Sequence, residues 1–166
     1  QQDRLPLMAC TAETFQPMNA PGVTPRMVDA ANDADLRAFY QLQRRAFDAE
    51  VEPSPEEIAQ LRHQIENGFW HCAIAEVAGE PVGVGSTLPW TTLCELAGVG
   101  TLPTSRRLGV AGTLSSFLVR HHFARGGDLI WLTAATDAAR ATYERIGFTH
   151  AGVAFHYIES DSPVRS

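Results

Sequence analysis

The sequence predicts a single domain of mixed α/β structure, because two kinds of segment alternate along its 166 residues. Helical runs open on capping residues and carry apolar side chains at helical spacing, whereas short apolar strands end at glycine or proline turns. From residue 26 on, the expected order is a strand, two helices, three strands, a helix, a strand, a helix and two final strands. Such an order is typical of a mixed sheet with helices packed on it, and the chain is long enough for one core.

The N-terminal part of the chain differs from the rest and reads as an extension. A short strand is expected at 4–9, and Pro6 restricts it to a sheet edge because proline has no N–H for a central ladder. Three prolines and a glycine within 11–25 indicate a linker. We therefore expect an extension over 1–24 that resembles the tail of a preceding domain, the domain proper over 25–160 and a C-terminal tail over 161–166.

The first half of the domain contains two helices whose starts are marked by capping residues. A strand is expected at 26–30, followed by Asn32, which with its acidic neighbours caps a helix. Residues 54–57, Ser-Pro-Glu-Glu, form a capping box with proline at the first helical position. The helix that they open ends at Asn67-Gly68.

The second half of the domain supplies most of the sheet. A hairpin is expected from strands at 69–77 and 82–88 around a turn at 78–81. The remaining elements are a strand that carries Glu95, a helix over 110–125, an apolar central strand over 128–134, a short helix from Thr136 or Asp137 to Arg145 or Ile146, and strands at 148–151 and 153–158.

The stretch from Glu95 to Thr113 has the pattern of a phosphate site. It begins as a strand, breaks at 103–105, passes through a basic loop with glycines and enters an apolar helix. The first turn of a helix has unpaired backbone N–H groups and partial positive charge, and both favour a phosphate. A Walker loop is excluded because no Lys follows its glycine, and the glycine spacing does not fit the dinucleotide-binding pattern.

The pattern Arg-x-x-Gly-x-Ala, formed by Arg106, Gly109 and Ala111, does fit a known loop. It resembles the signature of the GNAT superfamily of acyl-CoA-dependent N-acyltransferases. Over residues 25–160 the resemblance implies a mixed, largely antiparallel central sheet flanked by about four helices, with acetyl-CoA as co-substrate. The residues that it implies for pyrophosphate are Arg106, Arg107, Leu108, Gly109, Val110, Ala111, Gly112 and Thr113, and those for the pantetheine arm are Val99, Gly100 and Thr101.

The glycines in this strand also indicate how the backbone at residues 99–101 becomes accessible to the pantetheine arm. Gly98 and Gly100 suggest a bulge or a splay of the strand, which frees backbone groups for a ligand. The alternative is a strand that is merely rich in glycine.

A second match lies at Tyr143, in the run Tyr-Glu-x-x-Gly-Phe over residues 143–148. In GNAT proteins this tyrosine acts as general acid toward the leaving thiolate. A phenol with a pKa of about 10 can protonate or hydrogen-bond a thiolate whose conjugate acid has a pKa near 8.5. The alternative is that Tyr143 only packs its helix on the sheet. Where the family often has Asn, seven residues earlier, this chain has Thr136.

A third match is Glu95, eleven positions before Arg106, where several GNAT members hold a general base. An alkylamine with a pKa of about 10.4 is only about one part in a thousand neutral near pH 7.4. A general base is therefore needed to take the proton from the attacking amine. The alternative is a solvated or paired strand residue.

Composition excludes several other classes of function. A net charge of −6 argues against nucleic acid as a partner. The given sequence contains no apolar run long enough to span a membrane, and we expect no secretory signal. Three Cys without C-x-x-C spacing indicate reduced thiols and a cytoplasmic protein. The six His lack ligand-like spacing, so we expect no metal. The acidic residues at 48–57 are expected to be solvated surface; the alternative is that they attract a cationic amine, because in the resembling fold this connection borders the acceptor site.

These observations predict an N-acetyltransferase that moves acetyl from acetyl-CoA directly to an amine. Two alternatives stay open: an inactive acyl-CoA-binding sensor or partner module, and an unrelated phosphate- or nucleotide-binding α/β domain. The sequence does not identify the acceptor, and both small-molecule amines and peptides remain candidates. The resemblance makes a homodimer an option.

Overall fold

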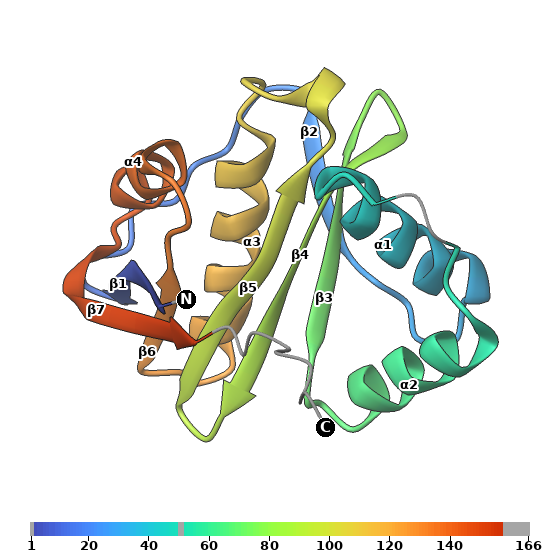
Figure 1. Cartoon of the computed structure of the whole chain (residues 1–166), viewed down its shortest axis with the longest axis horizontal. Coiled ribbons are helices and arrows are strands. Elements are labelled where there is room, and N and C mark those ends of the chain that lie inside the picture. The colour runs from blue at the N-terminus through green and yellow to red at the C-terminus, as the bar shows by residue number, and fades with distance from the viewer. Residues whose placement is uncertain (1, 50–51, 158–166) are drawn as a thin grey trace, which may run out of the picture.

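The computed structural model describes residues 2–49 and 52–157. Seven strands form one sheet in the order β2-β3-β4-β5-β6-β1-β7, in which β5 and β6 are parallel and the other neighbours antiparallel. The elements, in chain order, are β1 (Gln2–Thr11), β2 (Val23–Met27), α1 (Asp33–Ala46), α2 (Pro55–Glu66), β3 (His71–Val77), β4 (Glu80–Trp90), β5 (Leu93–Thr101), the 3-10 turn η1 (Pro103–Ser105), α3 (Val110–Ala124), β6 (Leu129–Thr133), α4 (Asp137–Arg145) and β7 (Thr149–Tyr157) (Figure 1). The predicted mixed, largely antiparallel sheet with four helices is confirmed.

Three helices begin at the capping residues that the sequence predicts. The Asn32 side chain accepts from the Ala34 N–H, and Thr136 accepts from the Ala139 N–H. Ser54 and Glu57 form the reciprocal capping box. Because these signals involve residues a few positions apart, they are readable without knowledge of the tertiary fold. No helix in the described part of the chain is long and apolar enough to cross a membrane.

Strand β1 lies inside the sheet, between β6 and β7, so the prediction of an edge strand at 4–9 is wrong. Pro6 is tolerated because the ladder with β6 starts only at Leu7. The Pro6 carbonyl still accepts from the Ala134 N–H at 3.0 Å, so proline removes a single donor at the end of that ladder. Residues 2–11 therefore belong to the same sheet as the rest of the domain.

Two further strand predictions change in detail. The expected strand at 26–30 is β2, which ends at Met27. The two expected final strands are one strand, β7, whose register with β1 slips between Leu7 and Met8. Such a bulge bends a strand without ending it. The last residue of that prediction, at 158, lies outside the described residues.

The sheet is covered by helices on both faces, and alternation along β3 shows how. Ala73 and Ala75 belong to a core with α3, whereas Cys72 and Ile74 belong to a core with α1 and α2. Successive side chains of a strand point to opposite faces, so each helical layer buries one of the two sets. Figure 1 shows α3 on one side of the sheet and α1 and α2 on the other.

Strand β5 separates from β6 after a short parallel ladder. The pairing covers Leu93 to Glu95 only, while β6 continues alongside β1. A bulge follows in β5, because Val84 pairs with Gly100 but Ser86 pairs with Ala97. Gly98 adopts a φ of +61° there, which glycine allows at low cost. The predicted bulge is confirmed, and the second half of β5 has no strand beside it on the β6 side within the described chain.

Candidate active site

A cleft of about 770 Å³ opens beside the second half of β5. Its walls come from β5, the loop before α3, the first turn of α3, one face of α4 and the end of α1. The residues that line it are Met18, Ala46, Phe47, Val99, Gly100, Thr101, Ser105, Arg106, Arg107, Gly109, Val110, Ala111, Gly112, Ala138, Ala139, Ala141, Thr142 and Arg145.

The N-terminus of α3 points into this cleft without a side-chain cap. Its N-cap is Gly109, which has a φ of +75° and offers no side-chain acceptor. The other three α-helices of the described chain have capping side chains. Val110, Ala111 and Gly112 form the first turn of α3 and line the cleft, where their N–H groups and the helix dipole favour an anion.

The loop before α3 holds a strained backbone. Arg107 has a φ of +66°, in the left-handed region that non-glycine residues seldom adopt. Strain of this type persists where the surrounding structure holds the backbone, and it is concentrated at ligand-binding loops. The strained conformation lets the chain turn directly from η1 into α3.

Three arginines make the cleft positively charged although the protein is acidic overall. Arg106, Arg107 and Arg145 line it, and no Asp or Glu of the described chain does. None of these three forms an ion pair with a described carboxylate. By contrast Arg140, on the same helix as Arg145, lies 3.6 Å from carboxylate oxygens of Asp137 and Glu144. The charge in the cleft is thus available to a bound anion.

The open edge of β5 forms a second, uncharged part of the cleft. Val99, Gly100 and Thr101 line it, and their strand has no partner on this side within the described residues. Gly100 leaves room for the end of α1, since a Cβ there would lie 2.7 Å from the Ala46 Cβ and 3.2 Å from the Phe47 ring. An extended ligand with amide groups can therefore pair with this strand as a further strand would.

The family model for the acetyltransferase (GNAT) family matches residues 36–148, which is more than half of the chain. The chain belongs to the GNAT acetyltransferase family. The match includes β5, the loop at 106–109, α3 and α4, and so contains almost all of the cleft. Met18 lies outside the matched range.

Solved structures agree with this GNAT assignment. A GCN5-related N-acetyltransferase from Kribbella flavida is 25% identical, with a TM-score of 0.69 over 91% of this chain and 56% of that chain. One from Sphaerobacter thermophilus is 21% identical, with a TM-score of 0.72 over 92% and 50%. A predicted acetyltransferase with acetyl-CoA from Clostridium acetobutylicum is 21% identical, with a TM-score of 0.58 over 84% and 96%. The chain spans 50 to 63% of the first four structures that it matches. No curated protein matches it.

The cleft of this GNAT domain brings together nine of the eleven residues predicted to bind the cofactor. Leu108 is not among its lining residues and is about half exposed. Thr113 is also absent from the lining, and it is buried. Its N–H donates to the Gly109 carbonyl and its hydroxyl accepts from the Ala20 N–H. Thr113 therefore stabilises the first turn of α3 without lining the cleft itself, and it links this turn to Ala20.

Tyr143 is not a lining residue of the cleft. Its ring contacts Phe148 edge to face, with centroids 5.7 Å apart, and it packs against the core formed with α3. Burial raises the pKa of its phenol to about 12, while the nearby Ser115 hydroxyl opposes this shift. Tyr143 is therefore neutral at physiological pH, and Thr142, the residue before it, does line the cleft.

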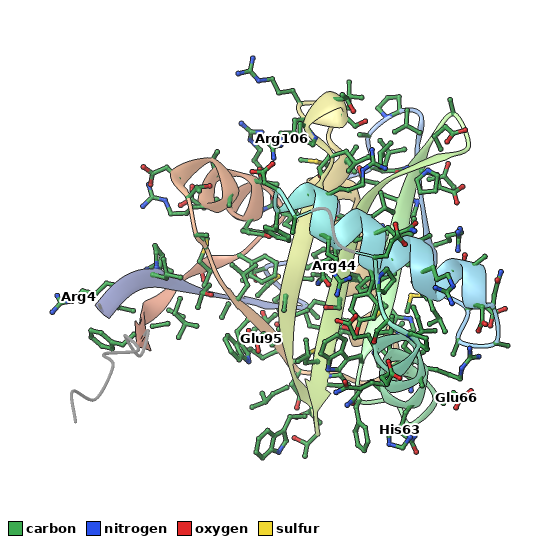
Figure 2. The ribbon with its side chains drawn as sticks, turned by 45° about the vertical axis from the view of Figure 1, so that its right-hand side comes forward. Arg4, Arg44, His63, Glu66, Glu95 and Arg106 are labelled. Carbon is green, nitrogen blue, oxygen red and sulfur yellow. The ribbon has the colours of Figure 1, made fainter. Side chains whose placement is uncertain are left out.

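Glu95 lies at the point where β5 and β6 separate. It pairs with Leu88 of β4 and forms the last pair with β6, opposite Trp131. The side chain is half-buried. Thr101 lies six positions after Glu95, about 20 Å along an extended strand. Figure 2 shows Glu95 and Arg106 near different ends of β5, so the carboxylate and the basic loop do not meet.

Several cleft residues have no counterpart among the sequence predictions. The sequence indicates Arg145 only as a helix end, although a cation in the last turn of α4 is a readable signal. Ala138, Ala139, Ala141 and Thr142 give α4 a face of small residues that leaves room for a ligand. Phe47 is 59% exposed at the end of α1, which is unusual for a large aromatic residue. Met18 carries no local signal at all.

No Cys or His of the described chain lines the cleft. Cys94 is buried, and burial raises the pKa of its thiol to about 11, so it is a poor nucleophile at neutral pH. The His71 and His121 rings contact each other with centroids 4.9 Å apart, and burial lowers the pKa of His71 to about 4. No group of three potential metal ligands occurs among the described residues.

Proposed function

We propose that this GNAT domain transfers acetyl from acetyl-CoA directly to an amine. The observation that carries the proposal is the meeting, in one cleft, of an uncapped helix N-terminus, three arginines and an open strand edge. Within the described residues these arginines have no carboxylate partner and this edge has no neighbouring strand. This set of donors suits a ligand with a pyrophosphate and an amide-containing arm. Acetyl-CoA has both, and it supplies the thioester.

Each part of the cleft then has a role toward acetyl-CoA. Arg106, Arg107 and the first turn of α3 hold the pyrophosphate, with Arg145 adding charge from α4. Backbone groups of Val99, Gly100 and Thr101 pair with the pantetheine amides. The extended pantetheine arm runs along β5 toward Glu95. It thereby brings the thioester to the place where β5 and β6 separate.

We assign the proton transfers to Glu95 and Tyr143. Glu95, directly or through a water, accepts the proton that the attacking amine loses. The Tyr143 phenol, neutral below pH 10, donates to the thiolate that leaves. An aminoglycoside, a polyamine, a peptide N-terminus and a protein lysine all fit this chemistry.

One observation favours a second candidate function. Tyr143 packs on Phe148 and is absent from the cleft lining, as expected of a residue with a structural role alone. The second candidate is therefore an acyl-CoA-binding module without turnover.

We further propose that the protein is located in the cytoplasm, since Cys10, Cys72 and Cys94 are free and buried.

The proposal is tested by measuring the release of free thiol from acetyl-CoA. The acceptors are amines of the four classes named above: aminoglycosides, polyamines, peptide N-termini and protein lysines. We expect at least one amine to increase thiol release above the rate without acceptor, and mass spectrometry to find one added acetyl on it. Binding of acetyl-CoA without turnover of any class would favour the binding module instead.

A further inference from the structure

The chain between β1 and β2 is fixed along α3 and α4. We name residues 14–20 the N-terminal strap. Figure 1 shows this connection passing beside α4 and α3 on its way to β2. The Met18 N–H donates to the Ser116 hydroxyl at 2.9 Å, and the Ala20 N–H donates to the Thr113 hydroxyl at 2.8 Å. The Gln16 N–H donates to the Ile146 carbonyl at 3.0 Å. The strap thus has regular attachment points on both helices.

The two hydroxyl groups that hold the strap are themselves buried. Thr113 and Ser116 are each 1% exposed. A buried hydroxyl without a partner costs roughly 1–3 kcal/mol, and here the strap supplies the partners. Phe15 adds an edge-to-face contact with Phe123, with centroids 5.8 Å apart. The strap is therefore an integral part of the domain.

Glycines on the helical side allow the strap to come this close. A Cβ at Gly112 would overlap the Met18 thioether, and one at Gly109 would lie 2.7 Å from the Ala20 Cβ. At Gly147, which ends α4, a Cβ would overlap the Thr14 carbonyl. Two of these glycines belong to the basic loop and the first turn of α3. The strap thus packs directly against the anion site, by which we mean the basic loop at 106–109 and the first turn of α3.

Met18 reaches past this contact into the cleft. It is a lining residue, and its Sδ and Cε lie at Gly112, where Thr142 of α4 also approaches. Its thioether therefore lies between the first turn of α3 and the small-residue face of α4. Methionine is apolar, flexible and polarizable, and it adapts to the shape of a ligand.

We propose that Met18 is a cofactor-binding residue: it forms an apolar wall of the acyl-CoA site, and the strap holds it there. The inference rests on the proposed function, because it needs acyl-CoA in the cleft. The thioether contacts an apolar part of the ligand, while the arginines hold its pyrophosphate. The acyl-CoA site thus includes a segment that precedes the region matched by the family model.

Methionine oxidation gives a readout that does not depend on turnover. Dilute hydrogen peroxide converts an accessible thioether to a sulfoxide, and peptide mass spectrometry measures the rate at each methionine. The full chain carries a matched control, since Met27 is also half-buried but lies on β2, away from the cleft. Met8 is 1% exposed and reports any unfolding.

We expect acetyl-CoA, which has no free thiol to consume the peroxide, to slow oxidation of Met18 at least threefold and to leave Met27 unchanged. Met18→Ala should weaken acetyl-CoA binding about five- to tenfold, Met18→Leu less than twofold, and Met27→Leu not at all. Equal oxidation rates of Met18 with and without bound acetyl-CoA, together with normal acetyl-CoA binding by Met18→Ala, would overturn the inference. A wild-type protein that binds no acetyl-CoA overturns the proposed function as well, and calorimetry with the unmodified protein detects that separately.

Discussion

The Tyr143 ring contacts Phe148 edge to face, with ring centroids 5.7 Å apart, and so joins the last turn of α4 to the residue that precedes β7. Removing only the hydroxyl leaves this contact in place, so the variant Tyr143→Phe separates packing from chemistry. We expect its thermal midpoint and its affinity for acetyl-CoA to stay close to wild type. Loss of a general acid lowers the turnover number by about 10²–10⁴. Steady-state kinetics with an accepted amine measures this, and an unchanged turnover number would assign Tyr143 to packing alone.

Alkaline titration of stability tests the buried phenol independently of catalysis. The pKa of Tyr143 is raised from 10 to about 12, so between these values the unfolded chain has released a proton that the folded chain retains. The contribution of this group to stability is therefore complete below pH 10 and declines as pH rises toward 12. Wild type should lose more free energy of unfolding across this interval than Tyr143→Phe does. Parallel denaturant curves for the two proteins would contradict the shift.

Two arginines on one helix form a matched pair for the anion site. Arg145 lines the cleft, whereas Arg140 is bound to Asp137 and Glu144. Arg145→Ala should weaken acetyl-CoA binding by about tenfold, the value of a charge-assisted hydrogen bond, and high salt should reduce the difference. Arg140→Ala should bind as wild type does. Calorimetry at two salt concentrations measures both, and equal losses would assign the effect to net charge alone.

Glycine substitutions test whether the strap packs as closely as described. Gly126 has a φ of +86° and open space around it, so Gly126→Ala should cost only the left-handed strain of about 1–2 kcal/mol. Gly147 has a φ of +99° and lies against the Thr14 backbone. Gly147→Ala should therefore cost roughly 1–3 kcal/mol more. Chemical denaturation gives both values, and equal costs would mean that the strap moves away easily.

Glu95 is expected to act on turnover more than on cofactor binding. Glu95→Gln preserves shape at the point where β5 and β6 separate and removes the ionisable carboxylate. The turnover number should fall by about 10²–10⁴, and the dissociation constant of acetyl-CoA should change less than about twofold. Glu80→Gln, at the exposed first residue of β4, is the control for a lost charge. A Glu95→Gln enzyme with wild-type turnover and pH profile would exclude the base role.

Some parts of the site were predictable because their signals are local. Asn32, Ser54 and Thr136 cap helices through contacts within three residues. Gly98 indicated the bulge in β5 because a glycine within a strand often marks one. The basic loop was recognisable because the chemistry of phosphate binding needs a helix start, glycine and arginine in close succession.

Other parts were not predictable because they depend on contacts between distant residues. Pro6 suggested an edge strand, yet the place of β1 depends on where its ladder with β6 begins, more than 120 positions along the chain. Met18 lies in a proline-rich segment that reads as a linker, and its place depends on contacts with distant residues such as Ser116 and Thr113 on α3. The direction of Tyr143, toward Phe148, is likewise a property of the folded chain.

Thermal unfolding with and without acetyl-CoA, with ATP as control, tests the central claim most directly. At one hundred times its dissociation constant, a ligand of the folded state adds about 2.7 kcal/mol of stability, a shift of several degrees for a domain of this size. The account predicts such a shift with acetyl-CoA, a smaller one with Arg145→Ala, and little change with ATP. An unchanged midpoint at millimolar acetyl-CoA, or an equal shift with ATP, would contradict an acyl-CoA site in this cleft.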